Sequence, residues 1–392
     1  MTAAKYRCTA LVLAAMLLLT GCGAKNPNPT QAATDSTQQE TFPPVIFVTE
    51  STDPSGTENT DPTGDTTPSE TTGGAELPLN AQGYPALTSK SGEVTTYDDG
   101  VFRVDNAAYE PYSFSSDAAQ NYATVVNKVA DSLAGTASVY CIPIPTSYGI
   151  TLPDDIREKL NSYSDQGEAM QKIVALLDSN VKVVNSYENL MRHRNEYLYF
   201  RTDHHWTALG AYYSYETFCD VKGIAPVTPE QHKTVEFDNF LGSFYWNNSG
   251  EDDALEADTV IAYEPLCEDA TMEFTDNKGD TYAWDIIMDV SNWASSSKYN
   301  TFCAGDNPYS VLTNPSITDG SSCVYIKESF GNALLPFLVE HYGTIYELDY
   351  RYWDGNVIDF VKEHGVKDVI FANNLSMIRS NYLIGSLAQI AE

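Results

Sequence analysis

The sequence predicts an α/β domain over roughly residues 80–392, with a parallel β-sheet covered by helices. From about residue 118 onward, stretches with helical spacing of apolar residues alternate with short apolar runs. Strands that alternate with helices in this way usually form a parallel sheet. The segment is also long enough to bury a full core, as one large domain or as one domain with an insertion.

The elements of this domain follow from local patterns of apolar residues and from helix stop signals. In the first half we expect strands at 138–145 and 181–185 and helices at 166–177 and 208–220, the last ending before Gly223. In the second half we expect strands at 322–327, 344–350 and 368–372, with helices near 332–341 and 356–364. Between the halves, residues 224–318 are rich in turns and short alternating runs such as 258–263. This segment is expected to be an insertion or a small β-rich subdomain near the mouth of the site.

Residues 1–22 have the pattern of a secretory signal. Lys5 and Arg7 precede an apolar run over 11–19, and Leu-Thr-Gly-Cys ends the segment at Cys22. The run is too short for a lasting membrane span. Its end resembles a bacterial lipobox, which implies cleavage before Cys22 and a diacylglycerol on its sulfur; an ordinary signal peptide and a retained anchor are the alternatives. The mature protein is therefore expected outside the cytoplasm, tethered to the cell membrane by lipid.

Residues 23–79 have a different composition, rich in Thr, Pro, Ser, Gly and Asp, with no Lys or Arg between Lys25 and Lys90. Such a chain cannot bury enough apolar area to offset its ordering entropy. We expect a disordered linker that holds the domain away from the membrane.

The net charge argues against two classes of partner, and the cysteine spacing argues against a zinc site. The formal net charge of −32 argues against nucleic acid or anionic lipid as a direct partner, because both repel an acidic surface. The 26 tyrosines would suit a surface that stacks on sugars, or equally a large core and its rim. Five cysteines follow Cys22 without a zinc-binding spacing. Cys141 is expected in the core, and Cys267 with Cys303 is a possible disulfide.

The segment Thr202–Thr207 (TDHHWT) is the first candidate site, and a metal site is one interpretation of it. Zinc needs three or four ligands in a fixed geometry. In an extended segment neighbouring side chains point opposite ways, so His204 and His205 would not face one ion. No H-E-x-x-H or paired-cysteine pattern supplies further ligands. We therefore expect neither a metal nor another cofactor.

A catalytic triad is the second interpretation. In an extended segment Asp203 and His205 share a face, so the Asp203 carboxylate can fix the tautomer of His205 while His204 turns away. The candidate nucleophile is Ser329, where a strand pattern stops and a helix pattern begins. That position lies at the carboxyl edge of a sheet, where a helix N-terminus can stabilise an oxyanion. Each segment also has a structural alternative. Ser329 would be a helix N-cap, and Asp203 or Thr207 would cap the helix that begins near residue 208, with Trp206 packed in the core.

These residues carry a resemblance to the DHHW protein family, named after Asp203–Trp206. The likeness covers most of 95–392 and includes the runs at 209–213, 240–245, 329–332 and 348–352. That family is similar to SGNH-hydrolase-like alginate O-acetyltransferases. The resemblance implies a flavodoxin-like three-layer sandwich, with Ser329 as nucleophile, His205 as base and Asp203 as its orienting carboxylate.

The sequence departs from the SGNH pattern at two points. Lys327-Glu328-Ser329 stands where Gly-Asp-Ser is usual. The glycine and asparagine of the oxyanion hole have no clear motif, and their candidates are Gly242, Asn373 and Asn374. Arg351 is a candidate for substrate contact, with an ion pair to Asp349 or Asp354 as the alternative.

The resemblance implies O-acetylation of a cell-envelope or exported polysaccharide outside the cytoplasm, with acetyl groups supplied by a membrane-bound O-acyltransferase partner. A carbohydrate esterase with the same triad is an alternative, because it would differ only in water access to the acyl-enzyme. A non-catalytic lipoprotein that binds a surface glycan is another.

Overall fold

The computed structural model describes residues 78–248, 250 and 252–392. The expected signal segment 1–22, the lipid site Cys22 and all but the last two residues of the expected linker 23–79 lie outside the described residues. Within the described part of the chain, no helix combines the length and the apolar character needed to cross a membrane.

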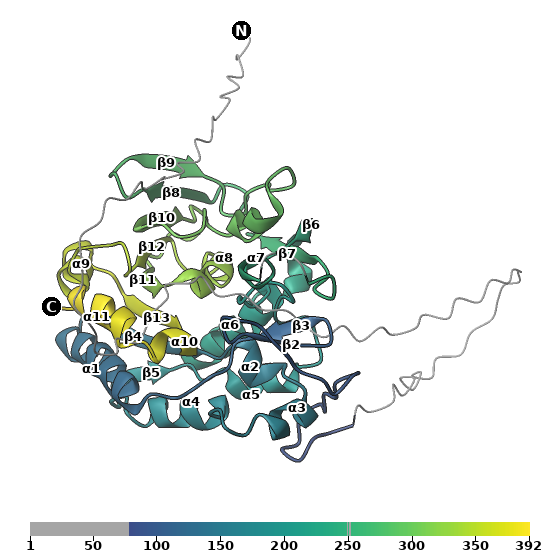
Figure 1. Cartoon of the computed structure of the whole chain (residues 1–392). Coiled ribbons are helices and arrows are strands. Elements are labelled where there is room, and N and C mark those ends of the chain that lie inside the picture. Colours follow the sequence, from purple (N-terminus) through teal and green to yellow (C-terminus); the bar gives the residue numbers. More distant parts are fainter. Residues whose placement is uncertain (1–77, 249, 251) are drawn as a thin grey trace, which may run out of the picture. The chain divides into compact units, whose positions relative to one another are not determined.

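The central feature is an eight-stranded sheet with the order β5-β4-β13-β11-β12-β10-β8-β9, which Figure 1 shows from one edge to the other. Five neighbouring strands are parallel: β5 (Val181–Val183), β4 (Ser138–Ile144), β13 (Asp368–Asn374), β11 (Ser322–Lys327) and β12 (Thr344–Asp349). All but the edge strand β5 consist largely of buried residues, as expected for strands covered on both faces. The predicted mostly parallel α/β sheet is confirmed.

The order of the parallel strands differs from the flavodoxin-like order 2-1-3-4-5. The last parallel strand in the chain, β13, lies in the middle of the set, between β4 and β11. Its two neighbours therefore belong to the first and second halves of the domain. This places the end of β13 directly beside the turn that follows β11.

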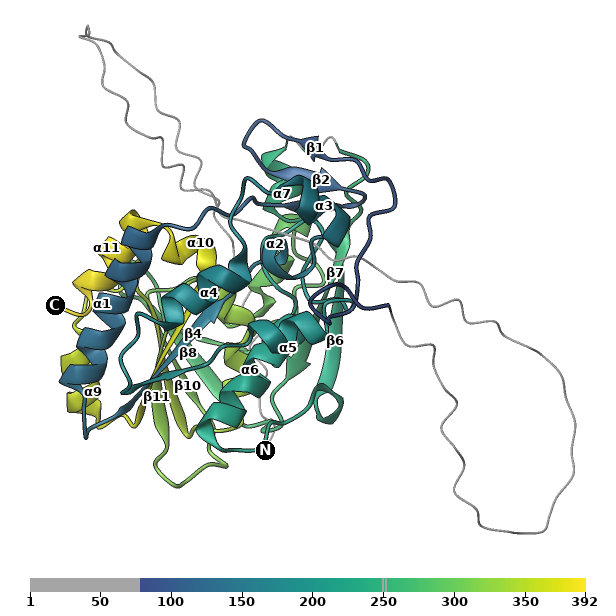
Figure 2. The same ribbon diagram turned by 90° about the horizontal axis from the view of Figure 1, so that it is seen from below.

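Helices cover both faces of the sheet, and successive strand residues alternate between two hydrophobic clusters. In β4, Val139 and Cys141 face one cluster, whereas Tyr140 and Ile142 face the other. The first cluster is covered by α1 (Ser116–Ser132), α4 (Gln166–Val174), α9 (Val357–His364), α10 (Leu375–Ile378) and α11 (Asn381–Gln389). The second is covered by α5 (Tyr187–Arg192), α6 (Ala208–Lys222) and α8 (Leu335–Leu338). Figure 2 shows α1, α9 and α11 on one side of the strands and α5 and α6 on the other.

The segment 224–318 is β-rich as expected, but it is not a separate subdomain. Strands β10 (Tyr309–Thr313), β8 (Thr271–Thr275) and β9 (Thr281–Trp284) continue the main sheet in antiparallel pairing beyond β12. In the described part of the segment, β6 (Lys233–Phe240) and β7 (Asp258–Glu264) form a separate two-stranded ribbon. The remaining elements of the segment are η1 (Pro229–Gln231), α7 (Ser243–Asn247) and η2 (Ser295–Thr301). Strand pairing with β12 satisfies backbone groups that an isolated subdomain would leave at an open edge.

The smaller elements lie before and between these parts. A three-stranded sheet contains β1 (Thr95–Thr96), β2 (Phe102–Val104) and β3 (Ala107–Tyr109). Short helices α2 (Ser147–Ile150) and α3 (Asp154–Lys159) follow β4.

Two local expectations are wrong. The helix predicted near 332–341 is replaced by the 3-10 turn η3 (Ser329–Ala333) and the single-turn α8, because Pro336 has no N–H to donate within a longer helix. The Cys267–Cys303 disulfide is absent: both thiols are free, Cys303 being buried against the sheet while Cys267 is half-buried in the loop after β7. Cys141 is buried in the core, as predicted.

Candidate active site

The Asp-His-His-Trp segment is a tight loop between α5 and α6. Two backbone contacts join the ends of the loop: an isolated antiparallel β-bridge between Tyr199 and Trp206, and a hydrogen bond from the Thr207 N–H to Leu198 O at 2.8 Å. The Thr207 hydroxyl caps α6 by accepting from the Gly210 N–H at 3.2 Å, which is one of the capping roles expected from sequence. On the other side of the loop, Asp258 accepts from the Thr202 N–H and hydroxyl, both at 2.8 Å. The loop is thus fixed at both ends by buried groups.

Asp203 and His205 form the expected pair. The distance from His205 Nδ1 to Asp203 Oδ1 is 2.5 Å, and the His205 N–H donates to the same oxygen at 3.2 Å. This pairing favours the tautomer with the proton on Nδ1 and leaves Nε2 as an acceptor. Burial raises the pKa of Asp203, while hydrogen bonds from His205 and the Ser243 backbone oppose that rise. His205 Nε2 is buried and has no hydrogen-bond partner among the residues that the structure describes, so this nitrogen can accept a proton from a group that reaches it.

His204 does not turn away, contrary to the expectation from an extended segment. Residues 201–205 form a series of bends, so the alternation of an extended strand does not apply, and the two imidazole rings lie with centroids 3.7 Å apart. Burial and the neighbouring His205 hold the pKa of His204 well below its usual value. The argument that two adjacent histidines cannot face one ion therefore fails here: Asp203, His204 and His205 each offer a ligand atom, all within 4.8 Å of one another.

Ser329 lies where expected, at the carboxyl end of β11 and at the start of η3. It is not the cap of this turn: Glu328 is, because its carboxylate accepts from the Phe330 N–H at 3.1 Å. The other Glu328 oxygen accepts from the Asn374 N–H at 2.7 Å, which ties the turn to the end of β13. Ser329 itself is 7% exposed.

The histidine loop and the serine turn, which are 124 residues apart, meet through Phe330. Trp206 Nε1 donates to Phe330 O at 2.8 Å, so Trp206 links the loop to the turn in addition to filling the core. The Phe330 ring lies with its centroid 5.2 Å from that of His205 and 5.3 Å from that of His204. The two segments are therefore in direct contact. No hydrogen bond joins Ser329 to His205 among the described residues, so this contact of the expected triad is not formed in the structure.

Tyr299 is a site residue that sequence reasoning missed. It stands on η2, and its ring stacks on His205 with centroids 3.8 Å apart and planes 5° apart. Its hydroxyl donates to Ser329 O at 3.0 Å. Tyr299 thus contacts the candidate base and the backbone of the candidate nucleophile at once. Nothing in the pattern around residue 299 marks it, because both contacts are made across the fold.

The three oxyanion candidates have different environments. The Gly242 N–H donates to Thr202 Oγ1 at 3.0 Å, and a Cβ at this glycine would lie 2.4 Å from Asp203 Cβ. Gly242 therefore allows close packing against the Asp203 loop, and its N–H is occupied. The Asn374 N–H is occupied too, since it donates to Glu328 at 2.7 Å, and its side-chain oxygen caps α10 by accepting from the Met377 N–H at 2.9 Å. Asn373 has a buried, unpartnered Nδ2, but its Oδ1 accepts from Tyr122 on the α1 side of the sheet.

A buried cluster of charges lies beneath the serine turn. Lys327 Nζ is 3.1 Å from Glu347, 3.3 Å from Asp306 and 3.4 Å from Asp349. These carboxylates hold the pKa of Lys327 above its usual value although burial alone would lower it. Asp306 also accepts from Asn332 Nδ2 at 3.1 Å, which joins the cluster to η3.

Arg351, the candidate for substrate contact, belongs to the same cluster. Its guanidinium pairs with Asp349 at 2.5 Å and with Asp306 at 2.8 Å, whereas no contact to Asp354 is found in the described structure. The ion-pair interpretation therefore describes Arg351 best, with Asp306 as the unpredicted partner.

The family model described as DHHW protein matches residues 74–348, which include both the histidine loop and Ser329. The chain belongs to the DHHW family. A crystal structure of a DHHW family protein from Eubacterium siraeum is similar to it, with 26% identity and a TM-score of 0.68 over 76% of this chain and 98% of that chain.

Other solved structures resemble this DHHW chain at lower identity. Bacillus cereus PatB1 with a sulfonyl adduct has 17% identity and a TM-score of 0.58, covering 74% of this chain and 99% of that one. The O-acetyltransferase domain of Pseudomonas putida AlgJ has 12% identity and a TM-score of 0.36, covering 75% and 98%. No curated protein sequence matches the chain.

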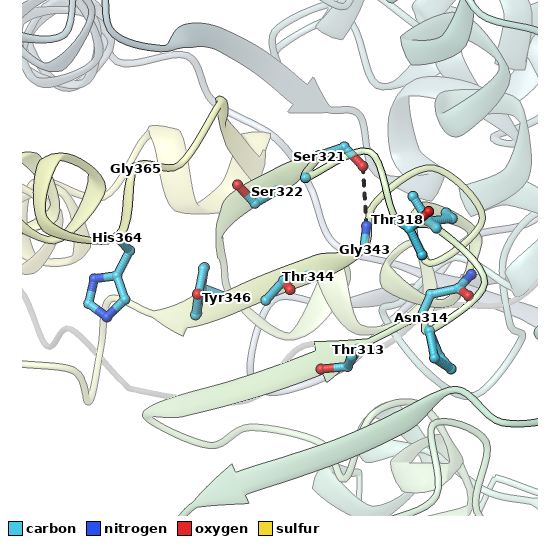
Figure 3. A pocket seen from close by; sticks show the side chains of 13 residues that line it. Thr313, Asn314, Thr318, Ser321, Ser322, Gly343, Thr344, Tyr346, His364 and Gly365 are labelled. Carbon is cyan, nitrogen blue, oxygen red and sulfur yellow. Dashed lines mark hydrogen bonds between the residues drawn. The ribbon is translucent and has the colours of Figure 1, made fainter.

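A polar groove of about 490 Å³ lies elsewhere on the sheet. It is lined by hydroxyl-bearing side chains, among them those of Thr313, Ser321, Ser322 and Thr344 (Figure 3). Ser322 and Thr344 begin β11 and β12, so the groove lies at the amino ends of these strands. Ser329 is at the opposite end of β11, and none of the predicted site residues lines this groove.

Proposed function

We propose that the protein is a serine-dependent O-acyltransferase, using acetyl groups, that acts on a cell-envelope or exported polysaccharide. The observation that carries this proposal is the buried His205, which Asp203 holds and whose ring lies 5.2 Å from that of Phe330, the neighbour of Ser329. Its Nε2 has no hydrogen-bond partner in the described part of the chain. A carboxylate, an imidazole and a serine are the parts needed to activate a hydroxyl for acyl transfer.

The proposed reaction has two steps, acylation of Ser329 and transfer of the acyl group to the acceptor. Ser329 Oγ attacks the acyl carbonyl carbon while His205 Nε2 takes the hydroxyl proton, and the leaving group departs with that proton. A sugar hydroxyl then gives its proton to His205 Nε2 and attacks the acyl-serine carbonyl; the bond to Ser329 Oγ breaks, and His205 returns the proton to Oγ, which releases the acylated sugar and free Ser329. Asp203 stabilises the imidazolium in both steps. Since Ser329 and His205 are not hydrogen-bonded here, the proposal requires this contact to close when the acyl donor binds, as catalytic contacts often do.

The location of the protein and its attachment to the membrane are part of the same proposal. The lipobox-like Cys22 and the Thr/Pro-rich segment after it support a lipid-anchored protein outside the cytoplasm, with the catalytic domain on a linker. A membrane-bound O-acyltransferase partner would supply the acyl group. The proposal that the domain is SGNH-like is based on the motif resemblance.

The experiment compares wild type, Ser329→Ala and His205→Ala with p-nitrophenyl acetate as the acyl donor. Release of p-nitrophenol and a mass increase of one acetyl group are expected for wild type and should be lost in both variants. Addition of EDTA should leave the wild-type rate unchanged, because His205 acts here as a base and not as a ligand. Equal acetyl release by all three proteins would rule out the triad.

An esterase with the same residues is the second candidate, supported by the same Asp203–His205–Ser329 arrangement. Glycan acceptors distinguish the two, because a transferase forms an acetylated glycan whereas an esterase forms acetate. The open Ser329–His205 contact also suits a non-catalytic glycan-binding protein, which would show neither product.

A further inference from the structure

A second groove, of about 640 Å³, opens between the β8–β9 hairpin and the loop after β12. Its aromatic wall includes Tyr309, Tyr352 and Trp353, and its polar wall includes Asp276, Asn277 and Asp354. Large aromatic faces beside a few polar groups are typical of sites that bind small molecules and sugars.

This groove lies at the same edge of the sheet as Ser329. Lys327, two residues before Ser329, pairs with Asp349 at the end of β12. The neighbouring residue Leu348 pairs with Tyr309 at the start of β10, and Tyr309 pairs with Thr275 at the end of β8. Strands are about 4.8 Å apart, so β10 is roughly 10 Å from β11. A chain molecule lying along this edge can thus reach from the groove to the serine turn.

The aromatic wall is held rigidly. Trp353 packs edge-to-face on Phe360 with centroids 5.9 Å apart, and a Cβ at Gly355 would lie 2.2 Å from the Trp353 ring. Tyr352 is 46% exposed, and the Arg351 guanidinium, fixed by Asp306 and Asp349, lies 5.3 Å from the centre of its ring. A pre-positioned, partly exposed ring loses little entropy when a sugar ring stacks on it.

The charges of the groove favour an uncharged ligand. Its lining contains two aspartates, Asp276 and Asp354, against one lysine, Lys278, which leaves one negative charge. The nearest guanidinium, that of Arg351, is already paired with two carboxylates. The whole chain carries a net charge of −32, so its field repels polyanions. Carboxylates and the Asn277 amide can instead accept hydrogen bonds from sugar hydroxyls.

We propose that this groove binds the acceptor of the acyl transfer, and that the acceptor is an uncharged polysaccharide, with several sugar units lying along the sheet edge while one hydroxyl reaches Ser329. The inference rests on the proposed acyltransferase function for its role in the reaction. Binding of the glycan itself does not depend on that function.

The test measures binding of three probes to the full chain by isothermal titration calorimetry: cellopentaose and chitopentaose, which are uncharged, and a polyuronate pentamer. Tyr352→Ala removes the exposed ring, and Tyr382→Ala is the matched control, because Tyr382 is also exposed, at 63%, and lies on α11 outside the groove. We expect at least one uncharged pentamer to bind better than the polyuronate. Tyr352→Ala should weaken that binding about five- to tenfold, as expected for loss of one aromatic contact, and Tyr382→Ala should not change it.

The two proposals fail in different ways. If Tyr352→Ala binds the pentamer like wild type, if the polyuronate binds best, or if no probe binds, the groove assignment is wrong even when p-nitrophenyl acetate cleavage depends on Ser329. If Tyr352→Ala loses binding while Ser329→Ala has normal acetyl release, the groove is a glycan site and the acyltransferase proposal is wrong.

Discussion

The substitution Asp203→Asn tests the electrostatic role of the Asp203 carboxylate. The variant keeps the size of the side chain and removes its charge next to His205 Nδ1, to which it is joined at 2.5 Å in a buried site. An Asn side chain can also present its amide N–H to Nδ1, which would favour the wrong tautomer of His205. Both effects remove stabilisation of the imidazolium that forms when Ser329 gives up its proton.

The size of the effect follows from the geometry of this pair. Two unit charges with centres about 4 Å apart interact by about 4 kcal/mol at an effective dielectric constant of 20. Loss of this much transition-state stabilisation slows a reaction about 10³-fold. Replacement of the triad aspartate in serine proteases costs about 10⁴-fold, which is within about one order of magnitude of this value. We therefore expect acylation of Asp203→Asn to be 10³- to 10⁴-fold slower.

The assay is the rate of acetyl-enzyme formation from p-nitrophenyl acetate, followed by stopped flow and corrected for the folded fraction from thermal unfolding. Asp258→Asn is the matched control, because Asp258 is a buried aspartate that holds Thr202 and Arg201 without a contact to His205. It should lower the unfolding temperature while the rate per folded molecule stays within about tenfold of wild type. A threefold or smaller decrease in Asp203→Asn would refute the role given to Asp203.

Three further predictions concern residues around the site and the core. Tyr299→Phe loses the hydrogen bond to Ser329 O but keeps the stack on His205, so it should cost about 0.5–1.5 kcal/mol in urea unfolding and slow acylation less than Tyr299→Ala; equal rates in both variants would contradict this. Lys327→Met leaves Glu347 without its buried cation, while Asp306 and Asp349 keep Arg351, and it should cost about 3–5 kcal/mol in urea unfolding; a cost below about 1 kcal/mol would show that the cluster is not coupled. Burial lowers the pKa of His341 to about 4, below the value near 6.5 of the unfolded chain. The contribution of His341 to stability is therefore fully present above about pH 6.5 and falls as the pH decreases toward 4. His341→Gln should lose part of this pH dependence in thermal unfolding measured at several pH values, and an unchanged profile would contradict the prediction.

Strands and helices with strong local patterns were predictable from sequence. The run Ser322–Lys327 has an apolar centre and is buried from its second residue onward, and its predicted bounds are those of β11. The helix at Ala208 was marked by Thr207 before it and Gly223 after it, and both residues have these capping roles. Local signals suffice here because the backbone hydrogen bonds and the caps are made within a few residues of the chain.

The rest depends on contacts between distant segments. The Asp203–His205 pair was predicted from spacing, but the bends of the loop bring His204 alongside it as well. Tyr299 and Asp306 reach the site from the segment that was expected to be an insertion. That segment is positioned by the pairing of β10 with β12. Such antiparallel pairing between strands more than thirty residues apart has no local sequence signal.

The most direct test of the central claim is covalent labelling of the nucleophile. Phenylmethylsulfonyl fluoride reacts with activated serine hydroxyls, and the adduct can be located by peptide mass mapping. We predict one sulfonyl adduct per molecule, on the peptide that contains Ser329, with loss of the label in Ser329→Ala and a large decrease in His205→Ala. Labelling at another residue, or no labelling of the folded wild-type protein by this reagent or by p-nitrophenyl acetate, would contradict the account.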